Sequence, residues 1–167
     1  MKLDDIKIGG KSTGLCQQKG VNCTITPDSG TSMLTMPKKH FKKFKEAHGA
    51  FDCSKEDFNE IPEISYVIGG VEYALPAHHW MNRTIDPKNK KGGRCETSVS
   101  DLDVGFDGLE DMFILGDQFM QYYYTIHDHE NDQVGFAPAI HQMDEALMIY
   151  NSEDLLEEVQ TIKHLLH

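Results

Sequence analysis

The sequence predicts a mainly β domain with short helices, followed by a helical tail. Short apolar or alternating runs end at Gly9-Gly10 and at Gly69-Gly70, as the strands of hairpins do. Apolar residues recur at helical spacing in segments 38–47 and 152–167. A chain of 167 residues is long enough for one sizeable core. We therefore expect one domain over residues 1–139 and a helical extension over residues 140–167.

The first half of the chain predicts a hairpin, a further strand and a helix. Residues 3–8 alternate and run into Gly9-Gly10, which predicts a hairpin, and residues 24–28 predict a strand that ends at an acid. Pro37 is expected at the first position of a short helix. Phe41, Phe44 and Ala47 should form its apolar stripe. Its five lysines are interpreted as a solvated face rather than as a basic binding patch.

The second half predicts further hairpins. Residues 61–68 and 71–75 should pair around Gly69-Gly70, and residues 76–81 should form a short helical turn. Residues 86–93 predict a polar loop. Residues 112–120 predict a buried apolar strand broken at Gly116, and residues 122–128 and 133–137 predict another hairpin. The tail helix is predicted from the following residues, with Asn151 or Ser152 as its cap: Leu155, Val159, Ile162 and Leu166.

Charge and cysteine content exclude several classes of protein. The net charge of -11 argues against a nucleic acid or an anionic membrane as partner. No apolar run has the length of a membrane span, and residues 1–15 lack a signal core. The cysteine spacings match no zinc pattern. Of the three pairings that four cysteines allow, we favour Cys16–Cys23 with Cys53–Cys95. Disulfides indicate an oxidising compartment, which a protein reaches with a signal segment. Because residues 1–15 lack such a segment, we expect that an upstream part of the protein is missing.

The most informative stretch is residues 23–37. A short apolar run leads into Asp28, and Ser29 and Thr31 bring hydroxyls that can orient its carboxylate. Gly30 allows close approach of the backbone. An acid that is merely satisfied by hydroxyls in a turn is the alternative interpretation of Asp28.

Matching segments lie on both sides of this stretch. Cys23 stands five residues before Asp28, and Pro37 stands five residues after Ser32. The segments, in chain order, are Leu3-Asp4-Asp5-Ile6-Lys7-Ile8-Gly9-Gly10; Asp28-Ser29-Gly30-Thr31-Ser32; Cys53; Ile61-Pro62-Glu63-Ile64; Gly69-Gly70-Val71-Glu72-Tyr73-Ala74-Leu75-Pro76; Phe113-Ile114-Leu115-Gly116-Asp117-Gln118-Phe119; Tyr123-Tyr124-Thr125-Ile126-His127-Asp128; and Val134-Gly135-Phe136-Ala137-Pro138-Ala139. In this order they resemble the C-terminal lobe of the pepsin-like aspartic endopeptidases, the pepsin and cathepsin D family.

The resemblance implies a fold of orthogonally packed antiparallel sheets with short helices. It also implies a two-lobed enzyme in which each lobe gives one aspartate to a shared site. The two acids share one proton and activate a water that attacks a peptide bond. Asp28 would be one of them. Thr31 would bond its outer oxygen, Gly30 would admit substrate and water, and Ser29 would reach the other lobe.

Further expectations follow from the same resemblance. The strand Ile114-Leu115-Gly116 would pass beneath the catalytic acid as the ψ loop. Residues 33–36 and 109–113 would line substrate pockets that accept apolar side chains. No cofactor is expected. The substrates would be peptides or proteins, in an acidic lysosome-like or vacuole-like lumen or outside the cell.

The chain also departs from the family pattern. No second Asp-Ser/Thr-Gly occurs, so the sequence predicts half an active site, whose partner would be the missing N-terminal lobe of the same parent protein. Pairing of two copies is the less favoured alternative. Pro27 stands where the family has a branched apolar residue in a central strand. Either Pro27 lies where no hydrogen-bond partner is needed, or it marks a degraded relative, which motivates a second alternative, a non-catalytic peptide-binding protein.

Two other patterns in the sequence resemble binding or modification sites. His127 and His129 flank Asp128 on one strand face, but no further ligands lie at metal spacing, so we expect no metal site. Asn82-Arg83-Thr84 and Asn22-Cys23-Thr24 fit the glycosylation sequon. The sequon at Asn82 is expected in a loop, whereas that at Asn22 is crowded by a cystine.

Overall fold

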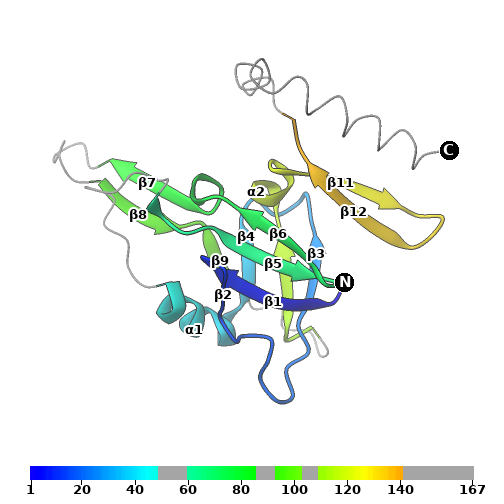
Figure 1. The fold of residues 1–167 in the computed structure, drawn as a ribbon, viewed down its shortest axis with the longest axis horizontal. Coiled ribbons are helices and arrows are strands. Elements are labelled where there is room, and N and C mark those ends of the chain that lie inside the picture. Colours follow the sequence, from blue (N-terminus) through cyan, green and yellow to red (C-terminus); the bar gives the residue numbers. More distant parts are fainter. Residues whose placement is uncertain (49–59, 86–92, 103–108, 141–167) are drawn as a thin grey trace. The chain divides into compact units, whose positions relative to one another are not determined.

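A computed structural model describes residues 1–48, 60–85, 93–102 and 109–140 (Figure 1). The predicted mainly β fold is confirmed. The elements, in chain order, are β1 Leu3–Ile8, β2 Lys11–Ser12, β3 Thr24–Pro27, β4 Leu34–Pro37, α1 Lys38–His48, β5 Ile64–Ile68, β6 Val71–Leu75, the 3-10 helix η2 Ala77–His79, β7 Met81–Ile85, β8 Gly93–Thr97, β9 Val99–Leu102, β10 Met112–Leu115, α2 Asp117–Met120, β11 Tyr123–Asp128 and β12 Gln133–Pro138.

The first sheet is antiparallel, in the order β2-β1-β5-β6. Its two tight hairpins turn at the predicted glycine pairs. Gly69 and Gly70 have φ of 58° and 82°, and Gly9 and Gly10 have φ of 54° and 72°. Positive φ at both central residues matches the twist of the flanking strands, and glycine adopts it without steric cost.

The second sheet is mixed, in the order β3-β10-β4-β9. β10 is parallel to β3 and antiparallel to β4, and β4 is parallel to β9. In the β3–β10 register, Leu115 is opposite Pro27. Because the two strands are parallel, their carboxyl ends lie side by side. This topology places Asp28, which follows β3, beside Gly116, which follows β10.

Two details of α1 differ from the prediction. Pro37 is the last residue of β4, and the helix begins at Lys38, so Pro37 precedes the helix instead of opening it. Ala47 is exposed, whereas His40 is buried together with Phe44. The buried face therefore lies on the side of His40 and Phe44, where His40 finds the polar partner described below.

Buried side chains from both four-stranded sheets pack into one hydrophobic core. Phe44, Trp80, Phe113 and Phe119 are its largest fully buried side chains. The predicted polar loop is outside the described residues except for Gly93, which begins β8, and the predicted tail helix is wholly outside them. Among the described helices, none has the length and apolar character needed to cross a membrane.

Candidate active site

Asp28 lies at the carboxyl end of β3, in a turn that is closed by backbone hydrogen bonds. Its N–H donates to the carbonyl of Leu115 at the end of β10, at 3.0 Å. Thr31 N–H donates to the carbonyl of Asp28 at 3.1 Å. The first bond ties the acid to the neighbouring strand, and the second folds the chain back immediately after it.

Both carboxylate oxygens of Asp28 accept a hydrogen bond from this turn. Gly30 N–H donates to Oδ1 at 2.9 Å, and the Thr31 hydroxyl donates to Oδ2 at 2.7 Å. These bonds favour the ionised form, and together, Thr31 first, they hold the pKa of Asp28 below its ordinary value. The side chain is half-buried, and the neighbouring Ser29 and Gly30 are exposed. Asp28 is thus a fixed carboxylate at the molecular surface.

Gly116 allows the Asp28 turn to pack closely against the end of β10. A Cβ at this position would lie 2.2 Å from the carbonyl oxygen of Thr31 and 2.3 Å from that of Met33, closer than atoms can approach. Asp117 N–H donates to the carbonyl of Thr31 at 2.8 Å, and Gln118 N–H donates to that of Ser32 at 3.3 Å. The absence of a side chain at Gly116 therefore lets the turn pack directly on the backbone that leads into α2.

Pro27 is the last residue of β3, which pairs with β10 on one side and is bridged to Lys2 at Thr24. Thr24 N–H donates to Asp111 and Asp28 N–H to Leu115, both toward β10. Ile25 N–H points the other way, to the carbonyl of Met1. By this alternation the nitrogen of Pro27 also faces away from β10, so proline removes no hydrogen bond between β3 and β10.

The expectation for the substrate pockets is wrong for three of the six apolar residues in the two segments. Leu34, Met36 and Phe113 are fully buried core residues. Met33 is 43% exposed and Leu109 is 37% exposed. All four residues of β4 are buried, whereas β10 alternates between buried and partly buried side chains, so only part of each segment is available at the surface.

The predicted disulfide Cys16–Cys23 is present, with the two Cα atoms 5.6 Å apart. It closes the loop that leads into β3. Cys53 lies outside the described residues, and only the backbone of Cys95 is described, in β8. The second predicted disulfide therefore stays a prediction.

The first sequon is in a strand and not in a loop. Asn82 lies in β7, opposite Glu96 of β8, because the strand begins directly after Trp80. Its side chain is exposed. Asn22, in the second sequon, is also exposed, and its backbone N–H donates to Asp111.

The histidines of β11 and the following turn lie near one another. The rings of His127 and His129 are 6.4 Å apart and nearly parallel. Within the described part of the chain, no group of three or more His, Cys, Asp or Glu residues is arranged to hold a metal ion.

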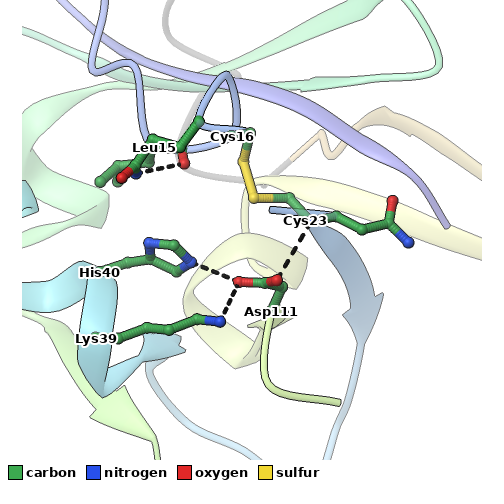
Figure 2. A network of polar contacts seen from close by, with 8 residues as sticks. Leu15, Cys16, Cys23, Lys39, His40 and Asp111 are labelled. Atoms are coloured by element: carbon green, nitrogen blue, oxygen red, sulfur yellow. Dashed lines mark hydrogen bonds and ion pairs between the residues drawn. A yellow bond between two sulfur atoms is a disulfide. The ribbon is translucent and has the colours of Figure 1, made fainter. Parts of the chain in front are cut away.

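A polar cluster around Asp111 was not anticipated from the sequence. His40 and Lys39 of α1 both contact its carboxylate (Figure 2). The only sequence signals were a histidine four residues before Phe44 on the buried side of the helix, and an acid directly before the apolar strand. Neither signal identifies the other residue as its partner.

In the aspartic proteases, an aspartate is typically followed by Ser or Thr and then Gly in a turn. This turn packs on an apolar strand that ends at a glycine. The family model described as eukaryotic aspartyl protease matches residues 1–139. The chain belongs to this family.

Several curated proteins are similar to the chain. Gastricsin of Callithrix jacchus is 30% identical over 144 residues, which cover 82% of this chain and 34% of the relative. Gastricsin of Oryctolagus cuniculus is 31% identical over 144 residues, 81% of this chain and 34% of the relative. Cathepsin E of Rattus norvegicus is 31% identical over 153 residues, 83% of this chain and 34% of the relative. The chain spans about a third of the length of these relatives.

Proposed function

We propose that this chain supplies one of the two catalytic carboxylates, Asp28, to an aspartic endopeptidase. The observation that carries the proposal is the hydrogen-bonded turn that fixes both oxygens of Asp28 at an exposed surface. A carboxylate that is oriented in advance can receive a second carboxylate and a water without rearrangement. Membership of the aspartyl protease family supports the same chemistry.

In this proposal the second carboxylate comes from an N-terminal lobe of the same parent protein. Two carboxylates at hydrogen-bonding distance cannot both be ionised, so the pair holds one proton. The ionised acid takes a proton from the water, and the protonated acid polarises the peptide carbonyl that the water attacks. Thr31 and Gly30 keep Asp28 in place through these steps. Ser29 is exposed and is available for contact with the other lobe.

The proposed parent protein has residues 1–139 as its second lobe and residues 140–167 as a helical extension. The coverage of about a third of each relative is consistent with a missing lobe. The disulfide Cys16–Cys23 supports an oxidising compartment. The acidic composition is compatible with an acidic lumen, where protonation of carboxylates relieves their mutual repulsion. Peptides and proteins are the proposed substrates.

The test is to produce the chain joined to the N-terminal lobe that its upstream reading frame encodes, and to measure proteolysis at acidic pH. Asp28→Asn should abolish activity, because asparagine cannot accept the proton of the water. The matched control is Asp132→Asn, in the exposed turn between β11 and β12, where φ is 52° and asparagine is well tolerated. Activity that survives Asp28→Asn would remove Asp28 from the mechanism.

The same experiment separates the alternatives. A folded two-lobed protein without activity would favour a non-catalytic peptide-binding relative. Activity of the 167-residue chain alone that rises with the square of its concentration would favour pairing of two copies. An upstream reading frame without an Asp-Thr-Gly or Asp-Ser-Gly would also contradict the two-lobed parent.

A further inference from the structure

Asp111 connects three segments that are far apart in the sequence. Its Oδ1 lies 2.7 Å from Nε2 of His40 and 2.8 Å from Nζ of Lys39, and its Oδ2 accepts the backbone N–H of Asn22 at 3.3 Å. An ionised carboxylate can only accept hydrogen bonds, so Nε2 of His40 carries the hydrogen. We call Asp111, Lys39, His40 and Asn22 the Asp111 clasp. Figure 2 shows the carboxylate between α1 and the disulfide-closed loop.

Three strands, β3, β10 and β4, meet at the candidate active site. The Asp111 clasp lies at the opposite end of each of these strands. Asn22 precedes β3, which leads to Asp28. Asp111 directly precedes β10, which leads to Gly116. Lys39 and His40 are in α1, which directly follows β4, the strand that leaves the Asp28 turn. One side chain therefore joins all three strands that meet at the site.

Backbone bonds continue this connection to the site. Thr24 N–H donates to the carbonyl of Asp111, at the start of the parallel β3–β10 pair. Asp28 N–H donates to Leu115 at the end of the same pair. The two bonds are four residues apart, which is about 13 Å along a parallel strand. If β3 shifted relative to β10 at the clasp, the backbone hydrogen bonds between the two strands would therefore also displace Asp28.

The clasp is partly buried, which distinguishes it from an ordinary surface ion pair. His40 is 4% exposed, and its ring stacks on Phe113 of β10 at 5.7 Å. The side chain of Asp111 is 15% exposed, and that of Lys39 is 49% exposed. Within the described residues, the charged or titratable side chains that contact the Asp111 carboxylate are those of Lys39 and His40. Glu110 precedes it in the chain, and the adjoining loop contributes an uncharged N–H and a disulfide that does not titrate.

We propose that Asp111 is an acid-sensitive positioning residue: its ionised form holds β3 and β10 in place, and its protonation releases the Asp28 turn. A protonated Asp111 would leave the Lys39 ammonium without its counter-charge and would weaken the bond to Nε2 of the buried His40. A buried hydrogen-bonding group that loses its partner destabilises the arrangement around it. The proposal concerns the geometry of the turn, so it holds whether or not Asp28 is catalytic.

The direction of the pH dependence follows from the contacts of Asp111. Burial alone would raise the pKa of Asp111, but the hydrogen bonds from Lys39, His40 and Asn22 lower it below the ordinary value of 3.8. A carboxyl with a lowered pKa in the folded state stabilises the fold above its unfolded-state pKa, and this stabilisation is lost as the pH falls through the folded-state pKa. Release is therefore expected on the acid side of the ordinary aspartate range.

Hydrogen exchange of the 167-residue chain tests the proposal. Protection factors of the amides of Asn22, Thr24 and Asp28 are followed by NMR as the pH is lowered through the aspartate range. We expect these three to lose protection together, at a pH at which the amides of Gly9 and Thr13, which donate to Glu63 and Ile6 at the first sheet, remain protected. Simultaneous loss in both sheets would overturn the proposal, as would retained protection at Asp28 after Asn22 has lost its own.

Three variants sharpen this test. Asp111→Asn has no titrating group, so the acid step should disappear and Asp28 should be weakly protected at every pH. Lys39→Gln keeps the fold, because Lys39 is half exposed, and it should move the acid step to higher pH, since a cation that lowers the pKa of Asp111 is lost. The matched control is Glu72→Gln, which removes the Lys7–Glu72 ion pair of the first sheet.

The variants also keep the proposal open to refutation if Asp111→Asn does not fold. An acid step that stays at the same pH in Lys39→Gln would overturn it. So would a Glu72→Gln variant that moves the step by as much as Lys39→Gln does, because a general charge effect would then account for both shifts.

Discussion

The acid–base behaviour of Asp28 is set by residues adjacent to it in the sequence. Both of its oxygens accept hydrogen bonds from residues two and three positions later. Gly30 has a further role, because a Cβ there would lie 3.2 Å from Oδ1 of Asp28 and crowd the carboxylate. A four-residue stretch therefore supplies both of these hydrogen bonds to the carboxylate, which is why the sequence could predict them.

Replacement of Thr31 by valine should raise the pKa of Asp28. The hydroxyl bond is the largest cause of the lowered pKa, and the Gly30 bond remains in the variant. The pKa is measured in the 167-residue chain from the ¹³C shift of the Asp28 carboxyl. Thr125→Val in β11 is the control, because the hydroxyl of Thr125 donates to a backbone carbonyl away from Asp28. An unchanged Asp28 titration in Thr31→Val would contradict the assigned role of the hydroxyl.

The same substitution should have a pH-dependent effect on stability. Because the folded-state pKa of Asp28 is lowered, its pairing with Thr31 stabilises the fold above the unfolded-state pKa and ceases to do so as the pH falls through the folded-state pKa. The difference in free energy of unfolding between Thr31→Val and the unchanged chain should therefore shrink in acid. Urea titrations at neutral and acidic pH measure this difference. A difference that grows in acid would contradict the assignment.

Gly116→Ala should destabilise the chain by about 3 kcal/mol or more, because the new methyl group would collide with two backbone carbonyls that cannot move independently of the Asp28 turn. Gly135→Ala is the matched control, since its Cβ would meet only Ile126 at 3.9 Å. Urea unfolding of both variants measures the difference. Equal effects would mean that the turn does not rest on Gly116.

At the scale of single elements, local chemistry decided what the sequence could predict. The Gly9-Gly10 and Gly69-Gly70 hairpins were predicted because the glycines themselves adopt the positive φ that such turns need. The apolar strand before Gly116 was predicted from its composition. The apolar stripe predicted for α1 is correct at Phe41 and Phe44 and wrong at Ala47. It also missed His40, because the burial of His40 depends on Asp111, 71 residues further along the chain.

Long-range strand pairing also limited how much of the candidate site could be predicted from the sequence. The Asp28 turn could be predicted from residues 28–31. Its packing against Gly116, however, depends on the parallel pairing of β3 with β10. No feature of residues 24–27 specifies that partner without the family resemblance. Pro27 left two interpretations open, a position that needs no hydrogen-bond partner and a degraded relative, and its nitrogen faces away from β10. The neighbour that each backbone group of β3 faces is a property of the assembled sheet and cannot be inferred from one strand.

The disulfide-closed loop before β3 should contribute measurably to stability. Cys16→Ala combined with Cys23→Ala should lower the free energy of unfolding by about 2–3 kcal/mol, as expected for a closed loop with a sequence separation of 7. Alanine avoids placing a hydroxyl at the buried Cys23 position. Lys19→Ala, an exposed change within the same loop, should alter stability by less than about 0.5 kcal/mol. Urea unfolding would contradict the prediction if the double variant matched the control.

At the scale of the whole described core, one aromatic residue connects the candidate site with the first sheet. Phe119 of α2 is fully buried. Its ring lies 6.4 Å from each of Tyr66 and Tyr73 in the β5–β6 hairpin, 4.8 Å from Tyr123 of β11 and 5.1 Å from Phe136 of β12. Because α2 begins immediately after Gly116, the backbone on which the Asp28 turn rests is anchored in this cluster.

Phe119→Ala should therefore have two effects. The loss of a fully buried aromatic ring should cost about 3–5 kcal/mol of unfolding free energy. The amide of Asp117, which donates to the carbonyl of Thr31, should also exchange faster than in the unchanged chain, because α2 loses its anchor. Tyr124→Ala, at a side chain that is 65% exposed, should change neither quantity appreciably. If Phe119→Ala lowered stability but left the protection of Asp117 equal to that in Tyr124→Ala, the aromatic cluster would stabilise the core without supporting the Asp28 turn.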